Sequence, residues 1–159
     1  DFWQRRQTHE TTIHTVDLFG CTDGAVPIEP ELAADGVDEV LTVFLPRMHD
    51  RGHPADLSAP VCLVASDVRR SWTVSPRAVV ADPTVGVPVQ PRGSTSESAP
   101  AVVDGPPRVV RRRLPGADQV AAPAETVYRV LWGRGSREEL TLTGDVARIH
   151  AFLDSRLVP

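Results

Sequence analysis

Apolar residues in the second quarter of the chain recur with the period of an α-helix. They follow residue 37 at offsets of three, four, seven, eight and eleven positions, which places them on one helix face. They are Val37, Val40, Leu41, Phe44, Leu45 and Met48. The segment 27–31, just before them, combines prolines with acidic residues and is suited to a first helical turn. The pattern predicts an amphipathic helix with one buried face.

Further helices are predicted at both ends of the chain. The first covers residues 2–18 and stops before Gly20. Another begins at Pro123 and ends at Gly133, and a closing helix follows residues 144–145. The residues expected on the inward face of that closing helix are Val146, Ile149, Phe152 and Leu153.

Short apolar or β-prone runs between these helices predict strands. Residues 61–65 and 71–74 flank a polar turn and predict a hairpin. Extended segments are also expected at 108–113, 119–122 and 140–143. Helices at both ends with strands between them predict an α+β fold with an antiparallel sheet and flanking helices.

One long segment does not fit this pattern. Residues 88–107 are rich in Pro, Ser and Gly, which predicts a flexible insertion near 91–106. The chain contains no G-x-G-x-x-G, P-loop or G-x-S-x-G motif, so nucleotide binding and α/β-hydrolase chemistry are unsupported.

Composition restricts the class of protein further. With 159 residues and 41% hydrophobic content the chain can bury one core, and it has no apolar run of about 18 residues that would span a membrane. The first residues resemble neither a signal peptide nor a translation start, so we expect the chain to begin inside a longer protein. Cys21 and Cys62 form no C-x-x-C pair, which favours a reduced, cytoplasmic protein. Cys21 has no His/Asp arrangement around it and is expected to be semi-buried rather than nucleophilic.

Charge argues against nucleic acid as a partner, because the net charge is −4. All seventeen basic residues are Arg, and this bias, with abundant Ala, Val, Asp and Pro, suggests a GC-rich bacterial genome. The run Arg111, Arg112 and Arg113 is expected to be a strand that carries its charges to solvent.

The stretch QTHETTIHTVD, residues 7–17, carries the strongest candidate chemistry. It is not the H-E-x-x-H zinc-protease motif, because His9 and His14 are five positions apart and leave the helix on different sides. Glu10, His14 and Asp17 share one face. Glu10 and His14 could hold two positions of a divalent ion, with a third ligand from another segment. The alternative is a solvated polar helix face.

Four segments together resemble the mycothiol-dependent maleylpyruvate isomerase family of actinobacteria. They are WQRRQTHETTIHTVD, ELAADGVDEVL, LWGRG and LTLTGDVARIHAFL. The resemblance implies a DinB-like four-helix metal-binding bundle followed by an α+β domain similar to sterol-carrier proteins. Residues 1–20 would then be the last bundle helix, and residues 27–159 the C-terminal domain.

The resemblance also implies site residues and cofactors. Glu10 and His14 would be metal ligands, most plausibly for zinc, and the family's remaining ligand is a histidine expected upstream of Asp1. Three other histidines, His49, His53 and His150, lie in segments that do not match it. Mycothiol would supply the reactive thiol. Arg134 would face the active site and bind a substrate carboxylate, with Arg137 as the nearest competitor.

The expected function is a metal-assisted, mycothiol-dependent isomerase or S-transferase that acts on a small electrophile. We expect the chain on its own to bind zinc weakly and to be inactive, because it lacks the third ligand. The alternative is a non-catalytic α+β module that binds a small molecule or lipid.

Overall fold

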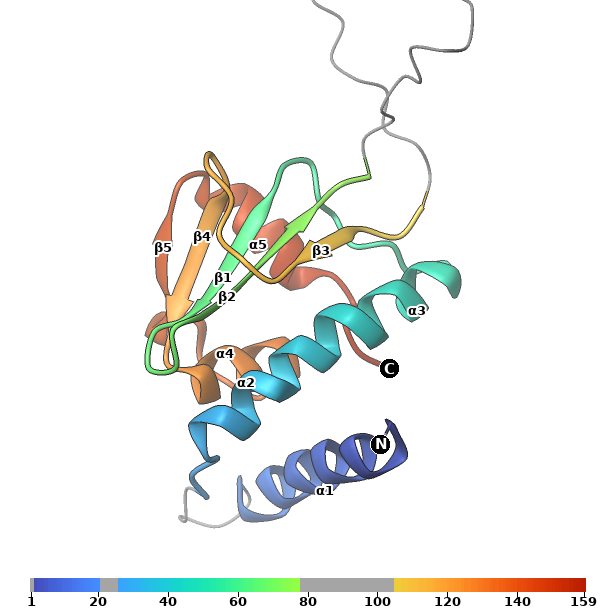
Figure 1. Ribbon diagram of the computed structural model, residues 1–159, viewed down its shortest axis with the longest axis vertical. Coiled ribbons are helices and arrows are strands. Elements are labelled where there is room, and N and C mark those ends of the chain that lie inside the picture. The colour runs from blue at the N-terminus through green and yellow to red at the C-terminus, as the bar shows by residue number, and fades with distance from the viewer. Residues whose placement is uncertain (1, 21–25, 78–104) are drawn as a thin grey trace, which may run out of the picture.

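The computed structural model of the chain describes residues 2–20, 26–77 and 105–159, and Figure 1 shows how they are arranged. Its helices are α1 (Phe2–Gly20), α2 (Pro30–Glu39), α3 (Leu45–Asp50), α4 (Ala124–Leu131) and α5 (Val146–Asp154), with a π-helical turn η1 (Val40–Phe44) and a 3-10 turn η2 (Arg137–Glu139). Its strands are β1 (Val61–Ala65), β2 (Arg70–Ser75), β3 (Arg108–Val110), β4 (Asp118–Ala122) and β5 (Thr141–Thr143). Cys21 and residues 91–104 of the predicted flexible insertion lie outside the described residues.

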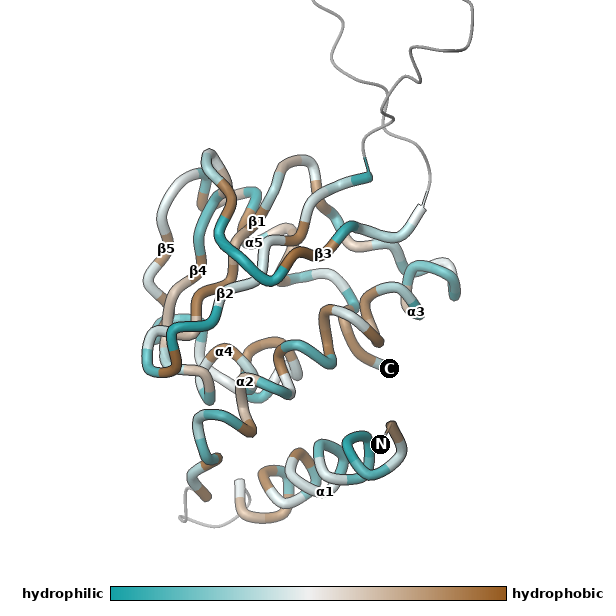
Figure 2. Tube along the Cα trace, viewed as in Figure 1, coloured by the Kyte–Doolittle hydropathy of each residue, from teal (hydrophilic) through white to brown (hydrophobic). Residues whose placement is uncertain are grey.

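The predicted amphipathic stripe forms one long helical segment, α2–η1–α3. Glu29 caps its start, since its carboxylate accepts a hydrogen bond from the Leu32 amide at 2.8 Å. The π-helical turn precedes Pro46, whose ring lacks an N–H and would clash with the carbonyl four residues earlier in a regular α-helix. All six residues of the stripe are buried, which confirms the prediction. Apolar residues recur along this segment in Figure 2.

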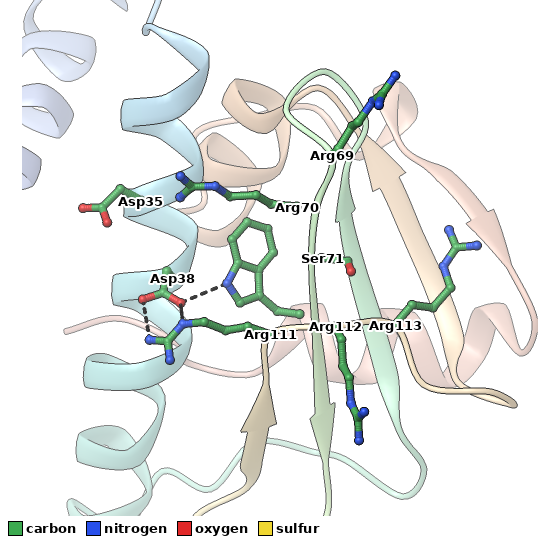
Figure 3. Close-up of a pocket in the computed structure, with 9 residues that line it drawn as sticks. Asp35, Asp38, Arg69, Arg70, Ser71, Arg111, Arg112 and Arg113 are labelled. Atoms are coloured by element: carbon green, nitrogen blue, oxygen red, sulfur yellow. Dashed lines mark hydrogen bonds and ion pairs between the residues drawn. The ribbon is translucent and has the colours of Figure 1, made fainter.

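The sheet has the strand order β3-β2-β1-β4-β5 and is mixed. The β1–β2 hairpin is antiparallel, as predicted, but β1 and β4 pair in parallel. The prediction of an antiparallel sheet was wrong because of the path between β3 and β4. That connection crosses the sheet over β2, where the Thr73 hydroxyl donates to the Arg112 carbonyl at 2.7 Å (Figure 3). As a result β4 lies on the side of β1 that is away from β2, and it runs in the same direction as β1.

The core lies between one face of this sheet and the helices. Leu63, Trp72 and Val120 occupy neighbouring positions on that face and are buried. Helix α4 contacts β1 and β4, and α5 contacts β4 and β5. Within α5, Ile149, Phe152 and Leu153 are buried as predicted, whereas Val146, at the start of the helix, is 45% exposed and was wrongly placed inward.

Helix α1 lies beside the α2 and α4 layer (Figure 1). His9, Ile13 and Val16 are buried on the face of α1 that packs on the rest of the chain. Trp3 and Leu18 remain largely exposed on α1. Among the described helices, none is long and apolar enough to cross a membrane.

Candidate functional site

Glu10, His14 and Asp17 form a row on one face of α1, as the helical spacing requires. The closest Glu10 and His14 atoms, Oε1 and Nε2, are 4.0 Å apart. The other ring nitrogen of His14 lies 3.8 Å from an Asp17 carboxylate oxygen. All three side chains are solvent-accessible. The row therefore presents an imidazole between two carboxylates.

Arg134 joins this row from the other end of the chain. Just after α4, Gly133 has a φ of 70°, which is easy for glycine, and the Arg134 amide then bonds back to the Arg129 carbonyl at 2.8 Å. This turn aims the guanidinium at Asp17, to which Nε and Nη2 both donate, the latter at 2.8 Å. The hydrogen bonds from Arg134 lower the pKa of the Asp17 carboxyl. The structure thus brings together residues that the sequence analysis placed in one site.

Arg137, the competing candidate, points elsewhere. Its guanidinium binds the Asp154 carboxylate at 2.6 Å and the Leu153 carbonyl at 2.9 Å, both on α5. Of the two arginines, Arg134 is the one beside Asp17.

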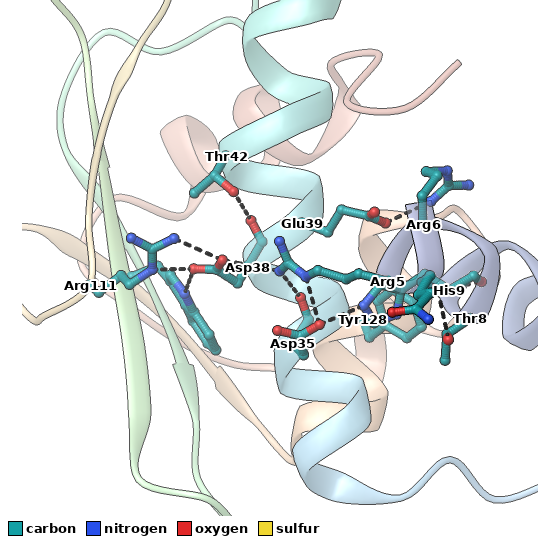
Figure 4. A network of polar contacts seen from close by, with 12 residues as sticks. Arg5, Arg6, Thr8, His9, Asp35, Asp38, Glu39, Thr42, Arg111 and Tyr128 are labelled. Carbon is teal, nitrogen blue, oxygen red and sulfur yellow. Dashed lines mark hydrogen bonds and ion pairs between the residues drawn. The ribbon is translucent and has the colours of Figure 1, made fainter. Parts of the chain in front are cut away.

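Arg6 ties the other end of the row to α2. Its Nη1 donates to the Glu39 carboxylate at 2.6 Å, and its Nη2 lies 3.7 Å from Glu10 (Figure 4). Glu39 is only 1% exposed, so this carboxylate depends on Arg6 for its charge partner. The guanidinium also stacks over the Phe44 ring, 4.7 Å from its centroid.

A cavity of about 250 Å³ lies between these two attachments. Arg6, Glu10, His14, Trp132 and Arg134 are among the residues that line it. Both guanidinium groups lie over the Trp132 ring, with the Cζ atoms of Arg6 and Arg134 at 5.8 and 5.7 Å from its centroid. Its indole Nε1 is buried and has no hydrogen-bond partner among the described residues. The cavity therefore has a positive rim beside the Glu10–His14 pair.

His9 faces the opposite way, into the protein. It is completely buried, and its Nε2 is 2.8 Å from an Asp35 carboxylate oxygen on α2. Its ring meets the Tyr128 ring edge-on, with centroids 5.9 Å apart. His9 therefore docks α1 onto the fold and does not share the face of Glu10 and His14.

The described residues fit a metal ion only in part. They contain no group of three or more His, Cys, Asp or Glu side chains that could hold an ion. Neighbouring ligand atoms in a tetrahedral zinc site are about 3.4 Å apart when bonds are about 2.1 Å long. The 4.0 Å between Glu10 and His14 needs only small side-chain rotations to reach this spacing. The pair can thus supply two ligands, and a complete site needs at least one more.

A second polar cluster, around Asp38, was not anticipated from the sequence. Asp38 accepts hydrogen bonds from the Trp72 indole at 3.0 Å, from Arg5 at 3.2 Å and from two nitrogens of Arg111 at 2.6 and 2.9 Å. The prediction that Arg111 lies on a strand was wrong, since β3 ends at Val110 and the Arg111 guanidinium turns toward Asp38 on α2. The three arginines of the run, Arg111, Arg112 and Arg113, are nevertheless exposed, as predicted. The only available signal was a pair of acids, Asp38 and Glu39, inside an apolar helical stripe.

Burial opposes the ionisation of Asp38, but the hydrogen bonds from Arg111 and Trp72 outweigh it. The pKa of the Asp38 carboxyl is therefore lowered. Arg5 bridges this carboxylate to Asp35, so the cluster joins α1, α2, β2 and the β3–β4 connection.

Comparison with known proteins gives one match. Searches of curated proteins and of solved structures found none for this chain. A family model described as the MDMPI C-terminal domain matches residues 31–151, which cover α2 and most of the structure that follows it. Because this match spans most of the sequence, the chain belongs to the family of the C-terminal domain of mycothiol-dependent maleylpyruvate isomerases, as its sequence segments indicated.

Proposed function

We propose that this chain forms part of a metal-assisted, mycothiol-dependent isomerase or S-transferase. In this proposal α1 is the last helix of a DinB-like metal-binding bundle, and the α+β unit closes over its ligand face. The observation that carries the proposal is the contact between Asp17 and Arg134. It brings the Glu10–His14 face of α1 and the C-terminal domain to one cavity.

Glu10 and His14 would hold the metal ion, with zinc favoured by their oxygen and nitrogen donors. When bound, such an ion would lower the pKa of the mycothiol thiol and so supply a thiolate nucleophile near neutral pH. Asp17 lies beside the second ring nitrogen of His14 and would orient the imidazole. Its own position is fixed by Arg134.

Arg134 retains donors for a substrate. A guanidinium has five N–H groups, and the structure uses three of those on Arg134: two toward Asp17 and one, from Nη1, toward the Trp132 carbonyl. One N–H remains on each terminal nitrogen. These two donors, with Arg6 near the same Trp132 ring, would bind the carboxylate of a small electrophilic substrate.

The alternative is a non-catalytic module that binds a lipid or small molecule in an apolar groove. A sterol-carrier-like fold would favour it, but that likeness stays a prediction. The cavity beside α1 is lined half by the polar side chains of Arg6, Glu10, His14 and Arg134 and half by Ile13, Phe44, Trp132 and Pro159. Two guanidinium groups beside an apolar wall suit a small carboxylate better than an uncharged lipid chain. This lining favours the enzyme.

Zinc titration of four variants on α1 tests the proposal, with the exposed Thr8→Ala as the matched control. We expect the chain to bind zinc weakly, with binding lost in Glu10→Ala and His14→Ala and unchanged in Thr8→Ala. Asp17→Ala should fall between, while His9→Ala should lower stability and leave zinc binding largely intact. Isothermal titration measures the affinities, and thermal unfolding measures stability.

Two results would contradict this assignment. Equal zinc affinity in His14→Ala and Thr8→Ala would remove the site from α1. Submicromolar zinc binding by the chain would instead show that it contains further ligands, and His49, His53 and His150 would then be the candidates. Thiol-dependent turnover is expected only in a protein that supplies the remaining ligand.

A further inference from the structure

A larger cavity, of about 510 Å³, is lined in part by Arg111, which lies on the other side of α2 from His9 of α1 in Figure 4. It shares no lining residue with the cavity beside α1. Trp72 of β2 lines the larger cavity, is only 2% exposed and donates its indole N–H to Asp38 on α2 at 3.0 Å. Five arginines contribute to the lining: Arg69, Arg70, Arg111, Arg112 and Arg113.

The two carboxylates that line this cavity are already occupied. Asp35 binds Arg5 and His9, and Asp38 binds Arg5, Arg111 and the Trp72 indole. They therefore leave most of the arginine charge unbalanced.

The remaining arginines have weak partners or none. Arg70 pairs with Glu31 at 2.6 Å, but both side chains are about half exposed, so an incoming anion would displace this pair at little cost. Arg69, Arg112 and Arg113 form no ion pair with any carboxylate in the described parts of the chain. A chain with a net charge of −4 thus gathers around one cavity several arginines without a carboxylate partner among the described residues.

The clustering of these arginines does not stabilise the fold. Arg111, Arg112 and Arg113 are consecutive, and the mutual repulsion of like charges disfavours such clusters unless an anion is present. Arg69 also adopts a left-handed backbone with φ of 53°, which suits glycine or asparagine better. Of the five arginines, Arg111 has a clear structural role, because it holds Asp38.

The arrangement of the side chains indicates the class of ligand. Figure 3 shows Arg70 and Arg111 pointing toward α2, while Arg112 and Arg113 point in different directions. Such spaced charges suit a molecule with separated anionic groups better than a single phosphate. The volume lies within the range of small-molecule sites. The buried Trp72 offers no open ring for stacking a base, which disfavours single-stranded nucleic acid.

We propose that this cavity binds a small polyanion with at least two phosphate or carboxylate groups. Arg70 and Arg112 would contact the ligand directly, with Arg69 and Arg113 adding positive charge at the rim. The site is independent of the function proposed for the α1 face.

Isothermal titration with inorganic pyrophosphate and with citrate, at constant low ionic strength, tests this proposal. We expect at least one probe to bind, and Arg70→Ala and Arg112→Ala each to weaken it about tenfold, through loss of a charge-assisted hydrogen bond. Arg51→Ala, which removes an exposed arginine outside the cavity, is the matched control and should bind as the parent does. Binding of pyrophosphate alone would identify a phosphate ligand, and binding of citrate alone a polycarboxylate; either supports the site.

Three outcomes would overturn the proposal. The first is that neither pyrophosphate nor citrate binds at about 10 mM, a concentration well above the dissociation constants of specific small-ligand sites. The second is that Arg51→Ala loses as much affinity for the probe as Arg70→Ala, which would mean that the anion is attracted by positive charge anywhere on the surface. The third is that an oligothymidylate binds through the same arginines more tightly than either probe, which would make this surface a nucleic-acid-binding surface. Circular dichroism of the variants, whose altered side chains are all exposed, confirms that they are folded.

Discussion

Two hydrogen bonds join the guanidinium of Arg134 to the carboxylate of Asp17, although 117 positions separate these residues in the sequence. The contact links the polar face of α1 to the turn after α4. With the Arg6–Glu39 pair at the other end of the row, it fixes the orientation of Glu10 and His14 relative to the α+β unit.

Replacement of Arg134 should separate its contribution to stability from the contribution to turnover that we propose for it. The Asp17 and Arg134 side chains are 38% and 32% exposed, so Arg134→Gln should reduce the free energy of unfolding by at most about 1 kcal/mol. In a protein that contains the complete metal site, the same change should abolish turnover of a carboxylate substrate. Arg137→Gln, which breaks only the contacts with α5, is the matched control and should retain turnover. Urea unfolding and steady-state kinetics provide the two readouts, and loss of turnover in Arg137→Gln alone would reverse the assignment.

The buried Arg6–Glu39 pair should respond asymmetrically to mutation. Arg6→Ala leaves the Glu39 carboxylate buried without its charge partner and should cost about 3–5 kcal/mol of unfolding free energy. The double variant Arg6→Ala/Glu39→Leu should recover much of that loss, because no charge then remains buried. Urea unfolding of the single and double variants measures the coupling. A cost below about 1 kcal/mol for Arg6→Ala would show that Glu39 finds another partner or takes up a proton.

Local patterns in the sequence were sufficient for most elements of this fold. The apolar stripe from Val37 to Met48 and the hairpin of residues 61–75 depend on spacing within short segments, and both were predicted. The parallel pairing of β1 and β4 was not, because it depends on the path of the β3–β4 connection across β2. No local pattern records that path.

In the candidate site too, features within one segment were predicted and contacts between distant segments were missed unless family resemblance indicated them. The common face of Glu10, His14 and Asp17 follows from helical geometry alone, and its proximity to Arg134 was expected from family resemblance. The Asp38 cluster was missed because its donors come from α1, β2 and the segment after β3. Helical spacing identifies neighbours on one helix but not the partner of a buried carboxylate.

The lowered pKa of Asp38 makes part of the stability depend on pH. A carboxyl whose pKa is lower in the folded state than in the unfolded state stabilises the fold above its unfolded pKa, near 3.9. That stabilisation is lost as the pH falls through the folded pKa. Arg111→Gln removes the largest favourable contact, so the stability difference between parent and variant should be full at pH 7 and smaller near pH 3. Urea unfolding at the two pH values tests this, with the exposed Arg108→Gln as control. A stability difference between parent and Arg111→Gln that is larger at pH 3 than at pH 7 would contradict a lowered pKa of Asp38.

Gly36 should be intolerant of a side chain despite its position inside α2. An added Cβ would overlap Cε2 of Tyr128 and lie less than 3 Å from two further atoms of the same ring. Alanine normally favours a helix over glycine by about 1 kcal/mol, but overpacking costs about 1–3 kcal/mol and should prevail here, since Tyr128 is fully buried. Gly36→Ala should therefore destabilise the protein. Gly20→Ala should be neutral or slightly stabilising, because the new Cβ meets no atom within 4 Å in the described residues outside its own stretch of helix. In a Tyr128→Leu background the cost of Gly36→Ala should largely disappear, because the ring that obstructs the new methyl group is gone. Chemical unfolding of the four variants measures this coupling. Equal effects of Gly36→Ala in both backgrounds would show that the close approach of α2 and α4 does not depend on Tyr128.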